Sequence, residues 1–206
     1  MKVSLADQHE PFYREFDSPL MRQIRLEAYG EDIGQHSWVS ADELRRDAQR
    51  LGLSASSRLL ELAVDVVLHL RDRQSLFREV SKLLRPEGRF LFTDAGVITG
   101  AVSNDELQRR SFHGYTQFVP IGWNERLLET VGLRLLESED RTASVFRNAS
   151  GKLAANRNHG EELERVAGVA SFQSQDEYLT TVAELARRGA VSRIVYLTEV
   201  RSPNAG

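Results

Sequence analysis

Residues 78–94 read REVSKLLRPEGRFLFTD, and this stretch decides the fold class. Its first part continues an amphipathic helix that begins at Asp72 or Arg73, with apolar residues at helical spacing. The sequence Arg85-Pro86-Glu87-Gly88 ends that helix and turns the chain. Residues 89–94 are then a short apolar run, typical of a strand in a sheet covered on both faces. A helix, a tight turn and a buried strand in this order predict an α/β fold.

The alternation of helices and strands extends in both directions from this stretch. Further strands are expected at 58–62, 133–140 and 192–200, and further helices at about 19–28, 125–131 (capped by Asn124) and 174–188. Two capping boxes, Ser40 with Glu43 and Ser103 with Glu106, each predict a helix start. Residues 143–168 are polar and helical in tendency, with expected interruptions at Gly151 and at 156–160. Such alternation predicts right-handed crossovers wherever the strands are parallel.

Composition narrows the class of protein. A chain of 206 residues with net charge −3 is one domain, or one domain with an insertion. It has no stripe rich in Lys and Arg, so we expect no nucleic-acid partner. The absence of cysteine excludes disulfides and a Cys nucleophile, and the five histidines lack metal-ligand spacing. No apolar run approaches the roughly 20 residues that span a bilayer, and the N-terminus lacks a signal-peptide core. We therefore expect a cytoplasmic protein without a metal or a membrane segment.

Four segments in order resemble class I S-adenosylmethionine-dependent methyltransferases of the small-molecule type. SRLLEL at 57–62 resembles their first strand, and 78–94 resembles a late helix, turn and strand, with Glu87 in place of the first turn glycine. NERLLETVGLRLLESED at 124–140 resembles the next helix and strand, and SRIVYLTEV at 192–200 the last strand. Residues 27–40, EAYGEDIGQHSWVS, resemble the N-terminal lid that covers the cofactor in some members.

The resemblance implies a Rossmann-like methyltransferase sheet that is truncated, with strands 1, 5, 6 and 7 kept and helices on both faces. Residues 1–56 would be an N-terminal arm and a helical lid. Residues 57–206 would be the truncated α/β domain, with a helical insertion on the acceptor side at about 143–190.

The largest departure from the family lies between Leu62 and Ala63. The family pattern is an acidic residue, one more residue, and then Gly-x-Gly-x-Gly, but only Glu61 and Leu62 match it. Residues 63–70 already resemble the end of the fourth strand, so on the order of 60 residues are missing. The missing glycines would let the backbone approach the cofactor at a helix N-terminus, and the carboxylate for the ribose is missing too. We therefore expect weak or no binding of S-adenosylmethionine.

The junction also constrains the topology. Parallel neighbouring strands need a crossover of a dozen or more residues. If Leu62 and Ala63 are bonded directly, 63–70 cannot be a parallel neighbour of 58–62. It should extend the strand begun at Ser57 or become helical and lead into the helix at 72–84.

Candidate cofactor-binding residues are Gly34, Gln35, Trp38 and Glu61. By resemblance Glu61 would lie near the methionine amino group; the alternative is a strand-end carboxylate that faces solvent. The loop with Gly34, Gln35, His36 and Trp38 suits a ligand cover, or else it is a connector in which Trp38 packs on the core.

Candidate catalytic residues are His69 and Tyr115, and candidate substrate-binding residues are Arg110, His113 and Trp123. His69 follows an apolar strand-like run and could orient or deprotonate an acceptor, or be a polar strand-end residue. The other four residues, with Phe118, could stack an aromatic acceptor or face a cationic amine; the alternative is ordinary core aromatics at an insertion.

Three interpretations of function follow. The first is methyl transfer from S-adenosylmethionine to a small N, O or C acceptor. A homodimer is a possible assembly of such an enzyme. The second is a catalytically inactive remnant that acts as a binding or oligomerisation module. The third is that the natural polypeptide contains the missing segment and behaves as the first interpretation says.

Overall fold

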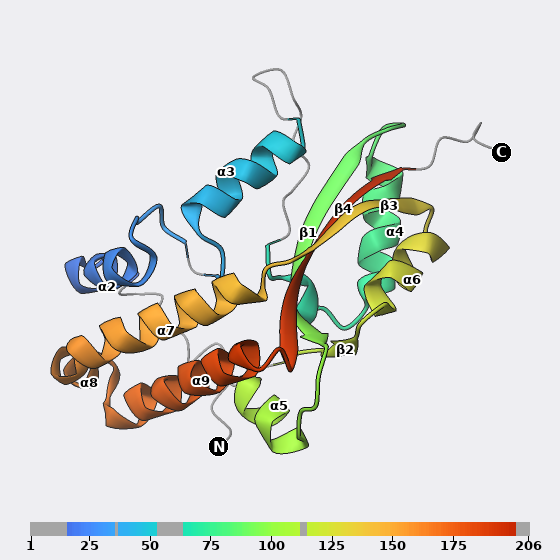
Figure 1. Cartoon of the computed structure of the whole chain (residues 1–206). Helices are drawn as coiled ribbons and strands as arrows, with labels where there is room; N and C mark the ends of the chain where they lie inside the picture. Colours follow the sequence, from blue (N-terminus) through green and yellow to red (C-terminus); the bar gives the residue numbers. More distant parts are fainter. Residues whose placement is uncertain (1–15, 36, 53–63, 112–114, 201–206) are drawn as a thin grey trace, which may run out of the picture.

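The computed structural model describes residues 16–35, 37–52, 64–111 and 115–200. Within them a mixed sheet has the order β2-β1-β4-β3 (Figure 1). Its strands are β1 (Arg89–Ile98), β2 (Val119–Pro120), β3 (Leu133–Asp140) and β4 (Val191–Val200). β4 runs antiparallel to both β1 and β3, whereas β1 and β2 are parallel. The strands expected at 89–94, 133–140 and 192–200 are confirmed, and the one expected at 58–62 lies outside the described residues.

Residues 64–70 do not form a strand. Val67–His69 is a 3-10 helix, η1, that leads into the helix α4 (Arg73–Leu83). The topological expectation for this segment is therefore confirmed in its described part. Leu62 and Ala63 themselves lie outside the described residues.

Helices cover both faces of the sheet. On one face, α4 and α6 (Trp123–Thr130) pack on the aromatic side chains of β1 and β4, where Phe92 stacks on Tyr196 at 4.8 Å between ring centroids. On the other face, Leu51 at the end of α3 (Ala41–Arg50) packs on Leu91. The predicted α/β architecture with helices on both faces is confirmed.

Local capping signals place several helix starts. α3 and α5 (Asn104–Arg110) begin at the two predicted capping boxes, and α2 (Pro19–Tyr29) begins at Ser18. α6 corrects a prediction, because it begins at Trp123 after Gly122 and Asn124 does not cap it. The Asn124 side chain instead donates to the buried Asp94 carboxylate at 2.8 Å. The Asn124 side chain is thus used for a tertiary hydrogen bond to Asp94, and not for capping the helix.

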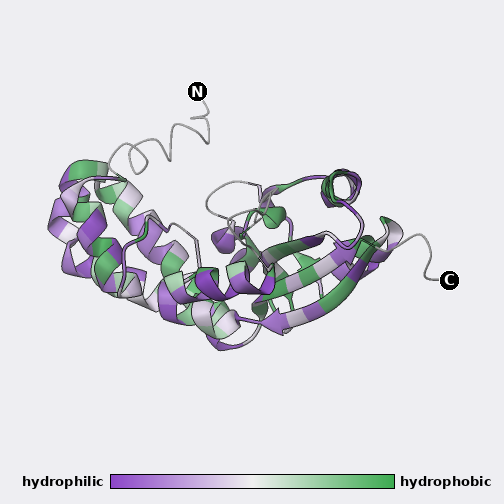
Figure 2. Cartoon of the chain, turned by 90° about the horizontal axis from the view of Figure 1, so that it is seen from above, coloured by the Kyte–Doolittle hydropathy of each residue, from purple (hydrophilic) through white to green (hydrophobic). Residues whose placement is uncertain are grey.

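A second helical group adjoins the sheet and consists of α2, α7 (Thr142–Asn158), α8 (Gly160–Ala167) and α9 (Val169–Arg187). Figure 2 shows these helices extending to one side of the sheet. The expected interruption at Gly151 is wrong, because α7 runs through it. A Cβ on Gly151 would lie 2.6 Å from the Ala28 carbonyl oxygen, so this glycine serves the close approach of α2 to α7.

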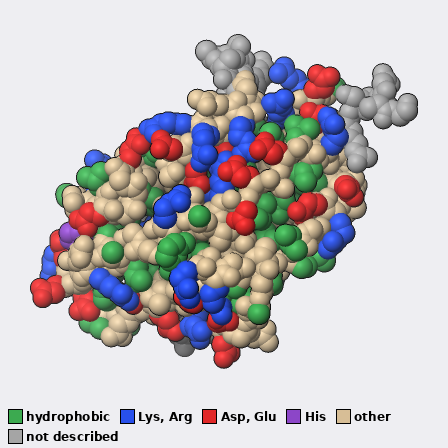
Figure 3. All heavy atoms as spheres, viewed as in Figure 1, with side chains coloured by type: hydrophobic (Ala, Val, Ile, Leu, Met, Phe, Trp, Pro, Cys, Tyr) green, Lys and Arg blue, Asp and Glu red, His purple; other side chains and the backbone are tan. Residues whose placement is uncertain are grey.

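The surface carries charges of both signs. Figure 3 shows Lys and Arg side chains interspersed with Asp and Glu across the visible face. Among the described residues, no helix combines the length and the apolar character needed to cross a membrane.

Candidate functional site

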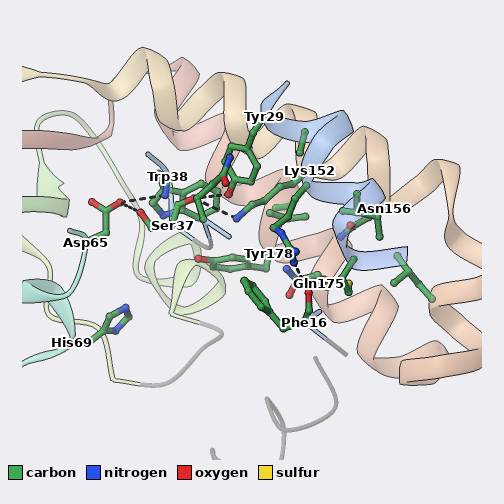
Figure 4. A pocket seen from close by; sticks show the side chains of 17 residues that line it. Phe16, Tyr29, Ser37, Trp38, Asp65, His69, Lys152, Asn156, Gln175 and Tyr178 are labelled. Atoms are coloured by element: carbon green, nitrogen blue, oxygen red, sulfur yellow. Dashed lines mark hydrogen bonds between the residues drawn. The ribbon is translucent and has the colours of Figure 1, made fainter. Parts of the chain in front are cut away.

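A cavity of about 410 Å³ lies within the helical group (Figure 4). Its walls come from α2, the loop 35–38, α7, α8 and α9, and Asp65 and His69 close the end nearest the sheet. Trp38 and Tyr178 also pack with Ala95, which lies in the carboxyl half of β1. This volume suits a small organic ligand.

Aromatic side chains form one wall of the cavity. Trp38 and Tyr178 lie 6.3 Å apart between ring centroids, and the Tyr29 hydroxyl donates to the Ser37 carbonyl oxygen at 2.6 Å. Burial raises the pKa of both Tyr29 and Tyr178 above its ordinary value. Both phenols are therefore neutral near pH 7 and offer apolar surface with a fixed polar tip.

Lys152 reaches into this wall from α7. Its Nζ lies 4.8 Å from the centre of the Trp38 ring, 5.2 Å from that of Tyr29 and 3.5 Å from the Ser37 carbonyl oxygen. Figure 4 shows the Lys152 side chain pointing toward Trp38 and Ser37. Burial lowers the pKa of the Lys152 amine to about 8, partly opposed by the negative charge of Asp65. The amine is thus mostly charged at pH 7 and sits in a poorly hydrated place.

Asp65 is the buried carboxylate at the sheet end of the cavity. Its Oδ1 accepts from Arg193 Nε at 2.8 Å and from Thr93 Oγ1 at 2.6 Å, and its Oδ2 accepts from Ser37 Oγ at 2.6 Å. Burial alone would raise the pKa of Asp65, but the Arg193 charge and the hydrogen bonds from Ser37 and Thr93 outweigh it, so the pKa is lowered. Asp65 is therefore ionised and its oxygens are engaged by the protein.

Arg193 extends this cluster to the N-terminal helices. Its Nη1 lies 3.5 Å from Glu43, which belongs to the capping box of α3 and accepts from Ser144 Oγ at 2.6 Å. A second buried pair, Asp47 with Arg141, joins α3 to the start of α7 by two hydrogen bonds of 2.7 and 2.8 Å. Buried charges of this kind join α3 to β4 and to the start of α7.

His69 stands exposed at the mouth of the cavity. Its Nδ1 lies 3.0 Å from the Tyr115 carbonyl oxygen. A carbonyl can only accept, so this contact sets the tautomer with hydrogen on Nδ1 and leaves Nε2 as the basic nitrogen. The segment that carries Tyr115 is fixed in turn, since Gln117 N donates to the Leu68 carbonyl oxygen at 2.7 Å.

The structure brings some of the predicted site residues together. Gln35, Trp38 and His69 line the cavity, and the Arg110 guanidinium lies behind Trp38, 5.6 Å from its ring centre. Tyr115 adjoins His69 but is half exposed, with Arg71 4.7 Å from its ring centre.

Other predicted residues lie apart from the cavity. Trp123 is half exposed at the start of α6, and Gly34 is in an exposed turn where its N–H donates to Asp32 at 2.9 Å. Glu61, His36 and His113 lie outside the described residues.

The described residues do not fit a complete S-adenosylmethionine site. That cofactor needs backbone N–H groups for its carboxylate and an acidic side chain for its ribose. The amide of Gly34 is engaged by Asp32, and Gln35 bonds to Ile33 N and the Glu31 carbonyl oxygen within its own loop. Asp65 is engaged by Arg193. None of these groups is therefore available for the cofactor without rearrangement.

The sequence interpretation missed Asp65, Lys152 and Arg193. Lys152 lies in a segment whose composition suggested only a polar helix, and Asp65 was one residue of an apolar run. Asp65 and Arg193 are 128 residues apart in the sequence, so no local pattern predicts their ion pair. For Asp65 and Arg193, the available signal was a charged residue within an apolar run, because a charged side chain is rarely buried without a partner.

Solved structures similar to this chain include methyltransferases and cyclopropane synthases. A protein of Galdieria sulphuraria assigned as a sarcosine dimethylglycine methyltransferase matches with TM-score 0.59 and 18% identity over 77% of this chain. The cyclopropane synthase MmaA2 of Mycobacterium tuberculosis matches with TM-score 0.61 and 17% identity over 78%. A phosphoethanolamine N-methyltransferase of Haemonchus contortus matches with TM-score 0.57 and 16% identity over 68%.

The chain spans 64%, 67% and 32% of these three proteins, respectively, so it is shorter than each of them. No protein-family profile matches the chain. No curated protein matches it by sequence either. The order of the strands, the helices on both faces and the similar solved structures establish that the chain has the class I S-adenosylmethionine-dependent methyltransferase fold.

Proposed function

We propose that the protein serves S-adenosylmethionine-dependent methyl transfer, and that the cavity holds the small-molecule acceptor. One observation carries this: in a methyltransferase fold, a ligand-sized cavity is lined by the exposed His69 and by Trp38 and Tyr178, which pack with Ala95 in the carboxyl half of β1. Ligands of α/β sheets bind outside the carboxyl ends of the strands. The N-terminal helices would then act as the lid over the acceptor.

His69 is the residue that would act on the acceptor. With Nδ1 held by the Tyr115 carbonyl oxygen, Nε2 can accept a proton from an O–H or N–H group in the cavity. Trp38 and Tyr29 would orient the acceptor and exclude water from it.

A second candidate function is ligand binding without catalysis. It is favoured by the absence of a glycine-rich turn after Glu61 and by the engagement of Asp65 within the protein. Such a protein would keep the acceptor side of the fold and bind S-adenosylmethionine weakly or not at all.

Three measurements on the 206-residue chain separate the two candidates. The intact mass verifies the junction between Leu62 and Ala63. A calorimetric titration measures the affinity for S-adenosylmethionine and S-adenosylhomocysteine. Transfer of a labelled methyl group to a panel of small amines, alcohols and acids measures activity, with His69→Asn as the test variant. The control is His159→Asn, at a half-buried histidine that contacts Glu27 and is not among the residues that line the cavity.

Methyl transfer that His69→Asn abolishes and His159→Asn retains supports the first candidate. The absence of transfer, together with no cofactor binding at millimolar concentration, refutes it and favours the second.

A further inference from the structure

The ion pairs at the wall of the cavity are closed within the protein. Arg25 forms a two-fold ion pair with Asp32, at 2.7 and 3.1 Å. Asp65 pairs with Arg193 at 2.8 Å, and Arg193 lies 3.5 Å from the buried Glu43. Both lining residues, Arg25 and Asp65, therefore already have a partner of opposite charge.

Other polar groups of the wall are engaged as well. The Lys152 amine contacts the Ser37 carbonyl oxygen and lies near the rings of Trp38 and Tyr29. The Gln35 amide donates to and accepts from backbone groups of its own loop. Because these groups have partners in the protein, they do not mark the place where the polar part of a ligand binds.

Two carboxamides that line the cavity differ from these groups. The side chains of Asn156, on α7, and Gln175, on α9, have no hydrogen-bond partner among the described residues. Asn156 is buried, with 9% of its surface exposed, whereas Gln175 is half-buried. A buried amide needs a hydrogen bond from water or from a ligand, because its desolvation is otherwise costly. Asn156 is therefore open to the polar part of a ligand.

The helices fix the place of this amide. Asn156 lies one helical turn beyond Lys152 on α7, so both side chains face the cavity. The next residue, Arg157, forms a two-fold ion pair with Asp176 of α9, at 2.6 and 2.8 Å. Asp176 follows Gln175, so this ion pair ties the two helices together at the level of both carboxamides.

The end of the cavity around Asn156 is apolar. Met21 and Ile24 of α2 and Leu163 of α8 line it, and they form one cluster with Ala155, the residue before Asn156. In apolar surroundings a polar group that finds no match stays unsatisfied, at a large cost in affinity. The match between donors and acceptors at Asn156 therefore decides which polar group binds there.

The chemistry of a carboxamide defines that match. Its C=O accepts and its NH₂ donates, side by side on one edge. A primary amide, a lactam or an imide presents the same pair in reverse, so its N–H can donate to Asn156 Oδ1 while its C=O accepts from Nδ2. A ketone or an ionised carboxylate can only accept, and it leaves Oδ1 without a donor.

We infer that the cavity binds a neutral molecule with an apolar or aromatic body and an amide edge, in which N–H and C=O lie side by side, and that Asn156 recognises this edge. Figure 4 shows Asn156 and His69 on opposite sides of the cavity. The amide edge is thus a handle that orients the ligand, and a different part of the molecule faces His69. The inference names the ligand class of the proposed acceptor site and rests on that proposed function only for its link to methyl transfer.

The test compares three probes of nearly one shape: 4-phenylbutyramide, the methyl ketone in which CH₃ replaces its NH₂, and 4-phenylbutyrate. Isothermal titration at pH 7 measures each affinity for the wild type, Asn156→Leu and Asn158→Leu, without any cofactor. Asn158 is an exposed residue of the same helix and is not among the residues that line the cavity, so its variant is a matched control. Far-UV circular dichroism and thermal unfolding check that each variant is folded.

We expect the wild type to bind the amide about tenfold more tightly than the ketone, as one additional hydrogen bond implies, and more tightly than the carboxylate. Asn156→Leu should abolish the preference for the amide over the ketone, and Asn158→Leu should retain it. The comparison of probes on the wild type needs no variant, so it decides the question even if Asn156→Leu does not fold.

Four results overturn the inference: a ketone that binds the wild type as tightly as the amide, a carboxylate that binds it more tightly, a preference that survives in folded Asn156→Leu, or no binding of any probe at millimolar concentration. If the amide binds as expected while no methyl group is transferred, the inference stands and only the proposed methyl transfer fails. If methyl transfer is found and the amide is not preferred, only the inference fails.

Discussion

Asp65 and Arg193 form a buried ion pair that joins the segment before η1 to strand β4, with 2.8 Å between Oδ1 and Nε. Asp65 has a φ of 53°, a left-handed conformation that only a few residue types tolerate. Thr93 holds it there, because Asp65 N donates to Thr93 Oγ1 at 2.7 Å and Thr93 Oγ1 donates back to the carboxylate. The pair therefore fixes Asp65, which lines the cavity, against the two central strands, β1 and β4.

Replacing Asp65 by Asn should strongly destabilise the fold. The change keeps the shape of the side chain but leaves the buried Arg193 with Glu43, at 3.5 Å, as its one remaining ion-pair partner among the described residues. A buried cation that loses its partner costs about 3 kcal/mol. Urea unfolding followed by circular dichroism measures this loss in the free energy of unfolding.

The control for this variant is Asp42→Asn, at an exposed residue of α3, whose effect should stay within about 0.5 kcal/mol. The pKa of Asp65 is lowered in the fold, so its stabilisation is present above the unfolded pKa of about 3.9 and is lost as pH falls through the lower folded value. The gap between wild type and Asp65→Asn should therefore narrow below about pH 4. Equal unfolding midpoints at pH 7 would show that the pair contributes nothing.

Replacing Gly151 by Ala should push α2 away from α7. The new Cβ would lie 2.6 Å from the Ala28 carbonyl oxygen and 3.2 Å from its Cα, and neither backbone atom can yield alone. Overpacking of this kind costs about 1–3 kcal/mol despite the better helix propensity of Ala. Thermal unfolding measures the cost.

Gly160→Ala is the matched control, because its Cβ would meet only the Phe172 ring at 3.4 Å, an ordinary contact. It should be neutral or slightly stabilising. A Gly151→Ala variant as stable as Gly160→Ala would contradict the close approach of α2 and α7.

The elements that sequence patterns predicted are those whose cause is local. The capping box of Ser40 with Glu43 places α3, and the apolar spacing after Asp72 places α4. Both signals act within a few residues, so the chain itself displays them. The topological argument also held for 64–70, the described part of its segment, because it depended on the length of a connection and not on a contact.

The errors and omissions have tertiary causes. Asn124 looked like a cap, but the buried Asp94 recruits its side chain. Gly151 looked like a helix stop, but its reason lies on α2. The cavity lysine was missed because its environment is built by the loop at Ser37 and Trp38, which is more than a hundred residues away in the sequence.

Trp38 should report ligand binding by its fluorescence. The chain has two tryptophans, and Trp123 lies on α6 away from the cavity, so Trp123→Phe leaves Trp38 as the single emitter. A molecule that enters the cavity contacts the Trp38 ring and should change the emission of that ring. A titration of Trp123→Phe with a neutral probe of suitable size, 4-phenylbutyramide, should therefore give a saturable change in fluorescence. Trp38→Phe should abolish the signal, and a response that persists there would place the probe elsewhere.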